Sequence, residues 1–145
     1  MSEAEFKENH LIKKYINTSW IALAEAPVTA IRGVSQKDAV DLNETFNIRT
    51  IRDFAENEYV CLAQGINSFS KASGEILKKK YNPEEFLRLK DQPVDAISGI
   101  SKGDTALLKR AFNIETIADL AENKYVLVAQ IILTIASLER LLIRS

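Results

Sequence analysis

The 145-residue sequence has few of the residues that hold a fold by covalent bonds or metal ions. It contains one cysteine, Cys61, and one histidine, His10. A single cysteine forms no internal disulfide, which fits a reducing cytoplasm and leaves packing to stabilise the fold. The histidine has no cysteine close to it in the sequence, so neither a metal cluster nor a Cys-His nucleophile pair is visible. We therefore predict a non-enzymatic protein with no catalytic residues, no cofactor and no metal.

An excess of one charge and a long apolar run are also missing. Lys and Arg number 19 against 20 for Asp and Glu, so no global field attracts nucleic acid or a membrane. The first residues are acidic where a signal peptide is basic. The most apolar stretch, Tyr125 to Leu138, is interrupted by Gln130, Thr134 and Ser137, and is shorter than the roughly 20 apolar residues that span a bilayer. We expect a cytoplasmic protein with no membrane contact.

The sequence contains an internal duplication at an offset of 66 residues. The segment 27–64 aligns with 93–130 without a gap, and 21 of the 38 positions are identical. Weaker similarity extends upstream to Ser19, so each copy is expected to begin with a short amphipathic helix. Hydrophobic residues make up 46% and charged residues 27% of the chain, which is ordinary for a globular protein.

Turn and capping residues divide each copy into helices. In the first copy Gly33 suits a tight hairpin, Ser35 and Asp38 form a variant of the capping box, and Asn47 suits a left-handed C-cap. Thr50 then caps a short helix. The equivalent residues of the second copy are Gly99, Ser101, Asp104, Asn113 and Thr116. The pattern predicts an all-α fold.

One face of the helix after each hairpin is apolar and predicts core positions. Leu42 and Phe46 share this face in the first copy, and Leu108 and Phe112 share it in the second. We expect the two phenylalanines to be equivalent core anchors.

The duplication predicts four segments that pack as a pseudo-symmetric helical domain. They are an N-terminal helix at 1–18, repeat 1 at 19–67, a helical linker at 68–82, and repeat 2 at 83–145 with a long C-terminal helix.

The motif A-I-x-G-[VI]-S-x-x-D, followed by Leu and then F-N-I-x-T-I-x-D-[FL]-A, resembles the helix-hairpin-helix family. It is most similar to the small domains at the N-terminus of archaeal recombinases and the C-terminus of the RNA polymerase alpha subunit. The resemblance implies that hairpin N–H groups bind a DNA phosphate. These groups would belong to Gly33, Val34, Ser35, Gly99, Ile100 and Ser101.

Two functions remain open. A protein partner is favoured by the low net charge and by Asp38 and Asp104, whose carboxylates would repel a phosphate at the hairpins. Sequence-independent DNA binding is favoured by the family resemblance. In that case Lys37, Lys102 and the run Lys78, Lys79 and Lys80 would add positive charge.

The last helix, Tyr125 to Ile143, is apolar over most of its circumference and must be covered. One covering is the N-terminal segment with Leu11, Ile12, Tyr15 and Ile16. The other is a second copy of the chain in a two-fold homodimer.

Overall fold

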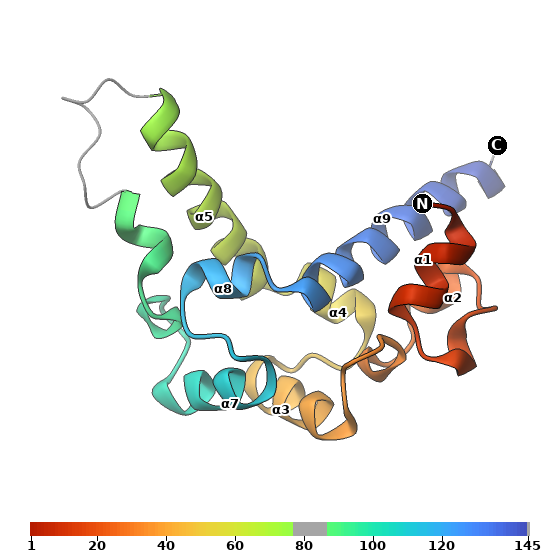
Figure 1. Ribbon diagram of the computed structural model, residues 1–145, viewed down its shortest axis with the longest axis horizontal. Helices are drawn as coiled ribbons and strands as arrows, with labels where there is room; N and C mark the ends of the chain where they lie inside the picture. Colours follow the sequence, from red (N-terminus) through yellow and green to blue (C-terminus); the bar gives the residue numbers. More distant parts are fainter. Residues whose placement is uncertain (77–86, 145) are drawn as a thin grey trace. The chain divides into compact units, whose positions relative to one another are not determined.

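The computed structural model describes residues 1–76 and 87–144, and the structure of these residues is all-α (Figure 1). Within these ranges the chain forms α-helices joined by short 3₁₀ turns and contains no β-strand. The predicted fold class is confirmed. The run Lys78, Lys79 and Lys80 lies outside the described residues.

The chain divides into two compact units. The first unit contains Met1–Asn57 together with Lys124–Ser145, and the second contains Glu58–Asn123. The helices of the first unit are α1 (Glu3–His10), α2 (Trp20–Ala24), α3 (Gln36–Phe46), α4 (Ile51–Glu56) and α9 (Lys124–Arg144). The second unit contains α5 (Glu58–Ile76), α7 (Lys102–Phe112) and α8 (Ile117–Ala121).

The local geometry of the two sequence copies is the same. Ser35 and Ser101 both start capping boxes, each accepting a hydrogen bond from the backbone N–H three residues later at 3.0 Å. Asn47 and Asn113 both adopt the left-handed conformation, with φ of 57°. These capping predictions are confirmed. Short-range sequence signals therefore give both copies the same turns and helix ends.

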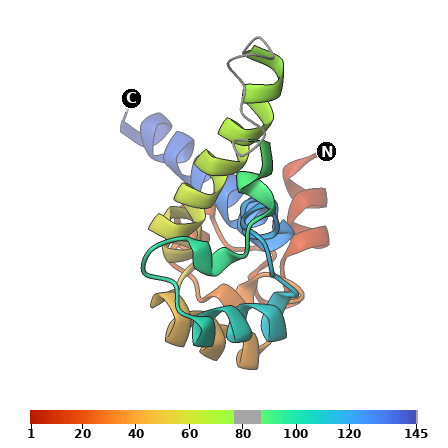
Figure 2. The same ribbon diagram turned by 90° about the vertical axis from the view of Figure 1, so that its left-hand side faces the viewer.

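The last helix of each copy packs on the other copy. In the first unit α9 lies against α2 and α4, and the Gln130 side chain donates a hydrogen bond to the carbonyl of Ala55 at 3.3 Å. In the second unit α5 lies against α8, as both ribbon views show (Figures 1 and 2), and Gln64 donates to the carbonyl of Ala121 at 3.3 Å. Each compact unit thus combines the hairpin of one repeat with the final helix of the other.

The two compact units do not coincide with the predicted repeats at 19–67 and 83–145. The chain passes from one unit to the other at Asn57–Glu58 and again at Asn123–Lys124. The apolar face of each final helix finds its partner surface on the other repeat, so the units cut across the repeat boundaries. Helix α5 also continues to Ile76, well into the predicted linker at 68–82.

The N-terminal helix is shorter than the predicted segment 1–18. Helix α1 ends at His10 because Leu11 becomes extended and pairs with Ile31. The Arg32 N–H donates to the His10 carbonyl at 2.8 Å, which fixes this pairing beside the hairpin. The inner face of α9 is covered mainly by α2 and α4, whereas the N-terminal residues were one of the two coverings considered from the sequence.

Burial of the predicted core residues differs between the copies. Leu42, Leu108 and Phe46 are buried, whereas Phe112 is half-buried. Phe112 is thus the more exposed of the two phenylalanines, although the sequence places them at matching positions.

Candidate functional site

The first hairpin already uses most of the backbone groups that the family resemblance assigns to a phosphate. The Val34 N–H donates to the carbonyl of Ile31 at 3.1 Å, closing the turn. The Ser35 N–H donates to the Asp38 carboxylate at 3.0 Å, as part of the capping box. Of the three proposed donors in this hairpin, only the Gly33 amide remains a candidate to bind a phosphate.

The second hairpin repeats this arrangement. The Ile100 N–H donates to the carbonyl of Ile97 at 3.1 Å, and the Ser101 N–H donates to the Asp104 carboxylate at 3.0 Å. A carboxylate thus occupies the place in the first helical turn where an external anion would bind. Four of the six candidate amides consequently have partners inside the protein.

Each hairpin glycine lies against a tyrosine of the helix exchanged from the other repeat. Gly33 has φ of +100°, and the Tyr125 hydroxyl oxygen is 2.5 Å from the place where a Cβ on Gly33 would stand. Gly99 has φ of +99°, and Tyr59 approaches it in the same way, also at 2.5 Å. Both glycines are therefore required by the backbone angle and by the close approach of a ring. The sequence signal for this contact was the identity of Tyr59 and Tyr125 in the two copies.

The proposed phosphate-binding lysines are not gathered around one hairpin. Lys37 is exposed near the start of α3, in the first unit. Lys102 begins α7 in the second unit, with a 96% exposed side chain whose Nζ is 3.4 Å from the Asp95 carboxylate. These two lysines belong to different units and do not form a shared basic site within either one.

A pocket of about 380 Å³ opens beside the first hairpin and contains basic groups that sequence reasoning did not combine. Its basic members are His10, Arg32 and Lys124, and the ring of Tyr125 forms part of its wall. Lys124 reaches this hairpin because α9 belongs to the first unit. The sequence placed Lys124 far from Arg32, so only the helix exchange reveals this cluster.

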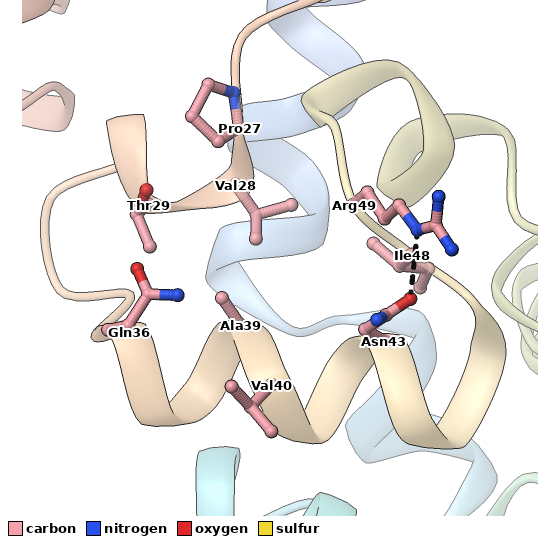
Figure 3. A pocket seen from close by; sticks show the side chains of 9 residues that line it. All are labelled: Pro27, Val28, Thr29, Gln36, Ala39, Val40, Asn43, Ile48 and Arg49. Atoms are coloured by element: carbon pink, nitrogen blue, oxygen red, sulfur yellow. Dashed lines mark hydrogen bonds between the residues drawn. The ribbon is translucent and has the colours of Figure 1, made fainter.

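A second pocket, of about 200 Å³, lies between the 3₁₀ turn Val28–Ala30 and α3 (Figure 3). Its apolar lining includes Val28 and Ile48, which are buried, and Val40, which is 47% exposed. Thr29 and Gln36 lie at one end, and Asn43 and Arg49 lie at the other, where Arg49 Nε donates to Asn43 Oδ1 at 3.3 Å (Figure 3). We call this pocket the α3 groove.

The second copy has charged pairs at the positions that form the ends of the α3 groove. Their residues are Asp95 with Lys102, and Lys109 with Glu115. Both pairs form ion pairs, whereas the equivalent residues of the first copy are uncharged except for Arg49. Duplicated backbone geometry therefore carries two chemically different surfaces.

The repeated carboxylates act as helix caps in the structure. Asp119 accepts backbone hydrogen bonds from Glu115 and Thr116, both at 3.0 Å. Burial raises the pKa of Asp119, but these backbone donors outweigh it, so the net pKa is lowered. Among the residues that the structure describes, no group of three or more His, Cys, Asp or Glu side chains is placed to hold a metal ion.

The outer face of α9 is exposed and apolar. The segment Ile117–Ile143, which covers α8, the residues after it and all of α9 but its last residue, is long and apolar enough to cross a membrane by composition, with a mean hydropathy of 2.0 in its most apolar window. Of this window 28% is buried inside the protein. The core helix of a soluble protein can have the same length and composition, so this property alone assigns no membrane role.

No protein-family model matches the chain, and neither a curated protein nor a solved structure shows significant similarity to it. The helix-hairpin-helix resemblance therefore rests on the sequence motif alone.

Proposed function

We propose that this chain is a non-catalytic interaction protein whose duplicated, helix-hairpin-helix-like repeats present surfaces to a protein partner. The α3 groove of the first repeat is the contact surface in this proposal. The observation that carries the proposal is the groove's combination of an apolar lining, with Val40 47% exposed, and polar residues at both ends. Such a combination suits an apolar side chain held by a few orienting hydrogen bonds.

The chemistry of the groove describes the segment that would bind. Val28, Val40 and Ile48 offer contacts to one apolar side chain, while Thr29 and Gln36 offer hydrogen bonds to a neighbouring peptide group. Arg49 uses its Nε for Asn43, and its guanidinium has further N–H donors suited to a carboxylate. We therefore expect a partner segment with an apolar side chain next to an acidic residue.

The hairpins support a protein partner over a phosphate. The amides of Val34, Ser35, Ile100 and Ser101 have internal acceptors, and for the two serines that acceptor is a carboxylate. A bound phosphate would have to displace that carboxylate or remain beside its negative charge. The net charge of −1 adds no long-range attraction for DNA.

The groove is tested with Val40→Glu and a matched control, Ala106→Glu, at the equivalent exposed position of the second copy. Proteins cross-linked to the tagged chain in native extract are quantified for the wild type and both variants, after thermal melts establish that all three are folded. We expect Val40→Glu to lose the partner and Ala106→Glu to retain it. Equal capture of every partner by Val40→Glu and the wild type would contradict the groove assignment.

DNA binding is the second candidate, and the pocket beside Gly33 is the observation that favours it. Arg32, Lys124 and His10 collect there, next to the hairpin amide without an assigned role. Charge reversal at Arg32 and Lys124, or at Lys37, Lys102, Lys78, Lys79 and Lys80, should then abolish binding to duplex DNA. Binding that persists in both charge-reversed proteins would eliminate the phosphate mechanism.

A further inference from the structure

Helix α9 carries an exposed stripe with the spacing of a coiled-coil seam. Its apolar members are Leu127, Ile131, Leu138 and Leu141, which are 43%, 44%, 55% and 61% exposed. Thr134, also exposed, completes the alternating spacing of four and three residues over two heptads. We call these five residues the α9 stripe.

The first unit packs against the side of α9 opposite the α9 stripe. The opposite side of the helix carries Ala129, Ile132 and Ala136, which are fully buried where α9 packs on α2 and α4. The helix therefore has one face committed to its unit and one apolar face directed to solvent. A contiguous exposed apolar surface of this kind is typical of an interaction site.

The duplicated helix α5 shows that the fold does not need apolar residues at these positions. The equivalents of Leu127, Ile131, Thr134 and Leu138 in α5 are Cys61, Gly65, Ser68 and Ala72. Both helices pack on their units through the same glutamine-to-carbonyl hydrogen bond. The fold of each unit therefore does not require large apolar side chains at the positions of the α9 stripe.

We propose that the α9 stripe pairs with the α9 stripe of a second copy, in an antiparallel two-fold dimer centred on Thr134. Leu127 and Leu141 are each seven residues from Thr134, while Ile131 and Leu138 are three and four residues away. Antiparallel pairing therefore sets Leu127 opposite Leu141 of the second copy, and brings Ile131 within one residue of the position opposite Leu138. The stripe is complementary to itself, as a two-fold interface requires.

The polar groups at the stripe are compatible with burial in this pairing. The Thr134 hydroxyl donates to the Gln130 carbonyl at 2.9 Å, and the Ser137 hydroxyl donates to the Leu133 carbonyl at 3.0 Å. Both hydroxyls keep these hydrogen bonds when water leaves the helix surface.

A second copy fits α9 better than a bilayer does. Gln130 is bonded to the carbonyl of Ala55, and Arg140 lies 4.0 Å from the Glu25 carboxylate, so α9 is tied to the first unit at two points along its length. A membrane-spanning arrangement would break these contacts and expose the surfaces of α2 and α4. The dimer leaves them intact.

Sedimentation over a wide concentration range tests the dimer, using the full chain. We expect the wild type to dimerise at micromolar concentrations and Ile131→Lys/Leu138→Lys to be monomeric, with dimer affinity lowered at least tenfold. A control that adds the same two charges at exposed positions of α5, Gly65→Lys/Ser68→Lys, should dimerise like the wild type. A wild type that stays monomeric at high micromolar concentration, or a dimer that persists in the α9 variant, would overturn the proposal.

Disulfide formation between single-cysteine variants tests the register, in a Cys61→Ser background with oxidised glutathione. A mixture of Ile131→Cys and Leu138→Cys should form a cross-linked heterodimer, and Ile131→Cys alone should not cross-link. Cross-linking of Ile131→Cys with itself would overturn the antiparallel register. Co-sedimentation with phosphatidylcholine vesicles that is lost in Ile131→Lys/Leu138→Lys would instead assign the stripe to a membrane.

Discussion

The Tyr125 hydroxyl oxygen stands 2.5 Å from the position that a Cβ on Gly33 would take, although the two residues are far apart in the sequence. Tyr59 has the same relation to Gly99. Each hairpin is thus closed by a ring from the final helix of the other repeat. The sequence motif encodes the hairpin turn, but the tyrosine that contacts it comes from the final helix of the other repeat. The contact therefore forms only because the two repeats exchange their final helices.

Alanine at either hairpin glycine should destabilise the protein. Gly33→Ala and Gly99→Ala each place a Cβ at a positive φ and force the tyrosine ring to move. Backbone strain of this kind costs about 1–3 kcal/mol, and displacement of the ring adds to it. Urea unfolding should show the loss for both variants. An unchanged melting temperature accompanied by loss of a ligand would show that these glycines serve binding instead of geometry.

Gly65→Ala is the control for that experiment and should have the opposite effect. Gly65 lies inside α5, and no atom is within 4 Å of its added Cβ. Alanine in a helix interior is about 0.5–1 kcal/mol more favourable than glycine. If Gly65→Ala is stabilised while both hairpin variants are destabilised, the losses come from the positive φ and the tyrosine contact at Gly33 and Gly99. They do not come from replacing a glycine as such.

The two phenylalanines of the duplicated helices should differ in their contribution to stability. Phe46 is buried, so Phe46→Ala should lower the free energy of unfolding by about 3–5 kcal/mol. Phe112 is half-buried, so Phe112→Ala should cost clearly less. Chemical denaturation of both variants makes the comparison. Equal losses would contradict the difference in burial.

The sequence predicted local structure better than it predicted which helices pack together. Ser35, Asn47 and Thr50 act within a few residues of themselves, so their caps are set by short-range hydrogen bonds. The contact between Gln130 and Ala55 instead depends on which of two similar surfaces each final helix meets. A duplicated sequence offers α5 and α9 nearly equivalent partners, and the alignment of the copies does not choose between them.

The site was predictable only in part for the same reason. Gly33 and Ser35 were found from the motif, but the motif does not show that Asp38 occupies the Ser35 amide. The basic pocket requires Lys124 beside Arg32, which follows from the helix exchange. The α3 groove depends on the space between the turn Val28–Ala30 and α3, and no residue pattern in the sequence predicts it.

Removing the glutamine side chain that bonds α9 or α5 to its unit should lower the free energy of unfolding. Gln130→Ala leaves the Ala55 carbonyl without its side-chain donor, and Gln64→Ala does the same for Ala121. Each loss should cost about 0.5–1.5 kcal/mol, measured by urea unfolding. Gln36→Ala, at an exposed position of α3, is the control and should be nearly neutral. Neutral results for both exchanged glutamines would argue against the helix exchange.

Asp119 should make stability depend on pH in the acid range. Its pKa is lowered in the folded protein by the backbone donors of Thr116 and Glu115, which outweigh its burial. Its stabilising effect is therefore fully present above the ordinary aspartate pKa of about 3.9, and is lost as the pH falls through the lower folded value. Asp119→Asn should flatten the decline in melting temperature below about pH 4. An identical decline in the variant would exclude this contribution.

Internal hydrogen bonds close both hairpins, and we propose that the chain binds protein instead of DNA phosphates. Titration of labelled duplex and single-stranded DNA with the wild-type protein, at about 50 and 200 mM salt, tests it most directly. We expect no saturable binding whose strength depends steeply on salt. Saturable binding that weakens by orders of magnitude between the two salt concentrations would contradict it.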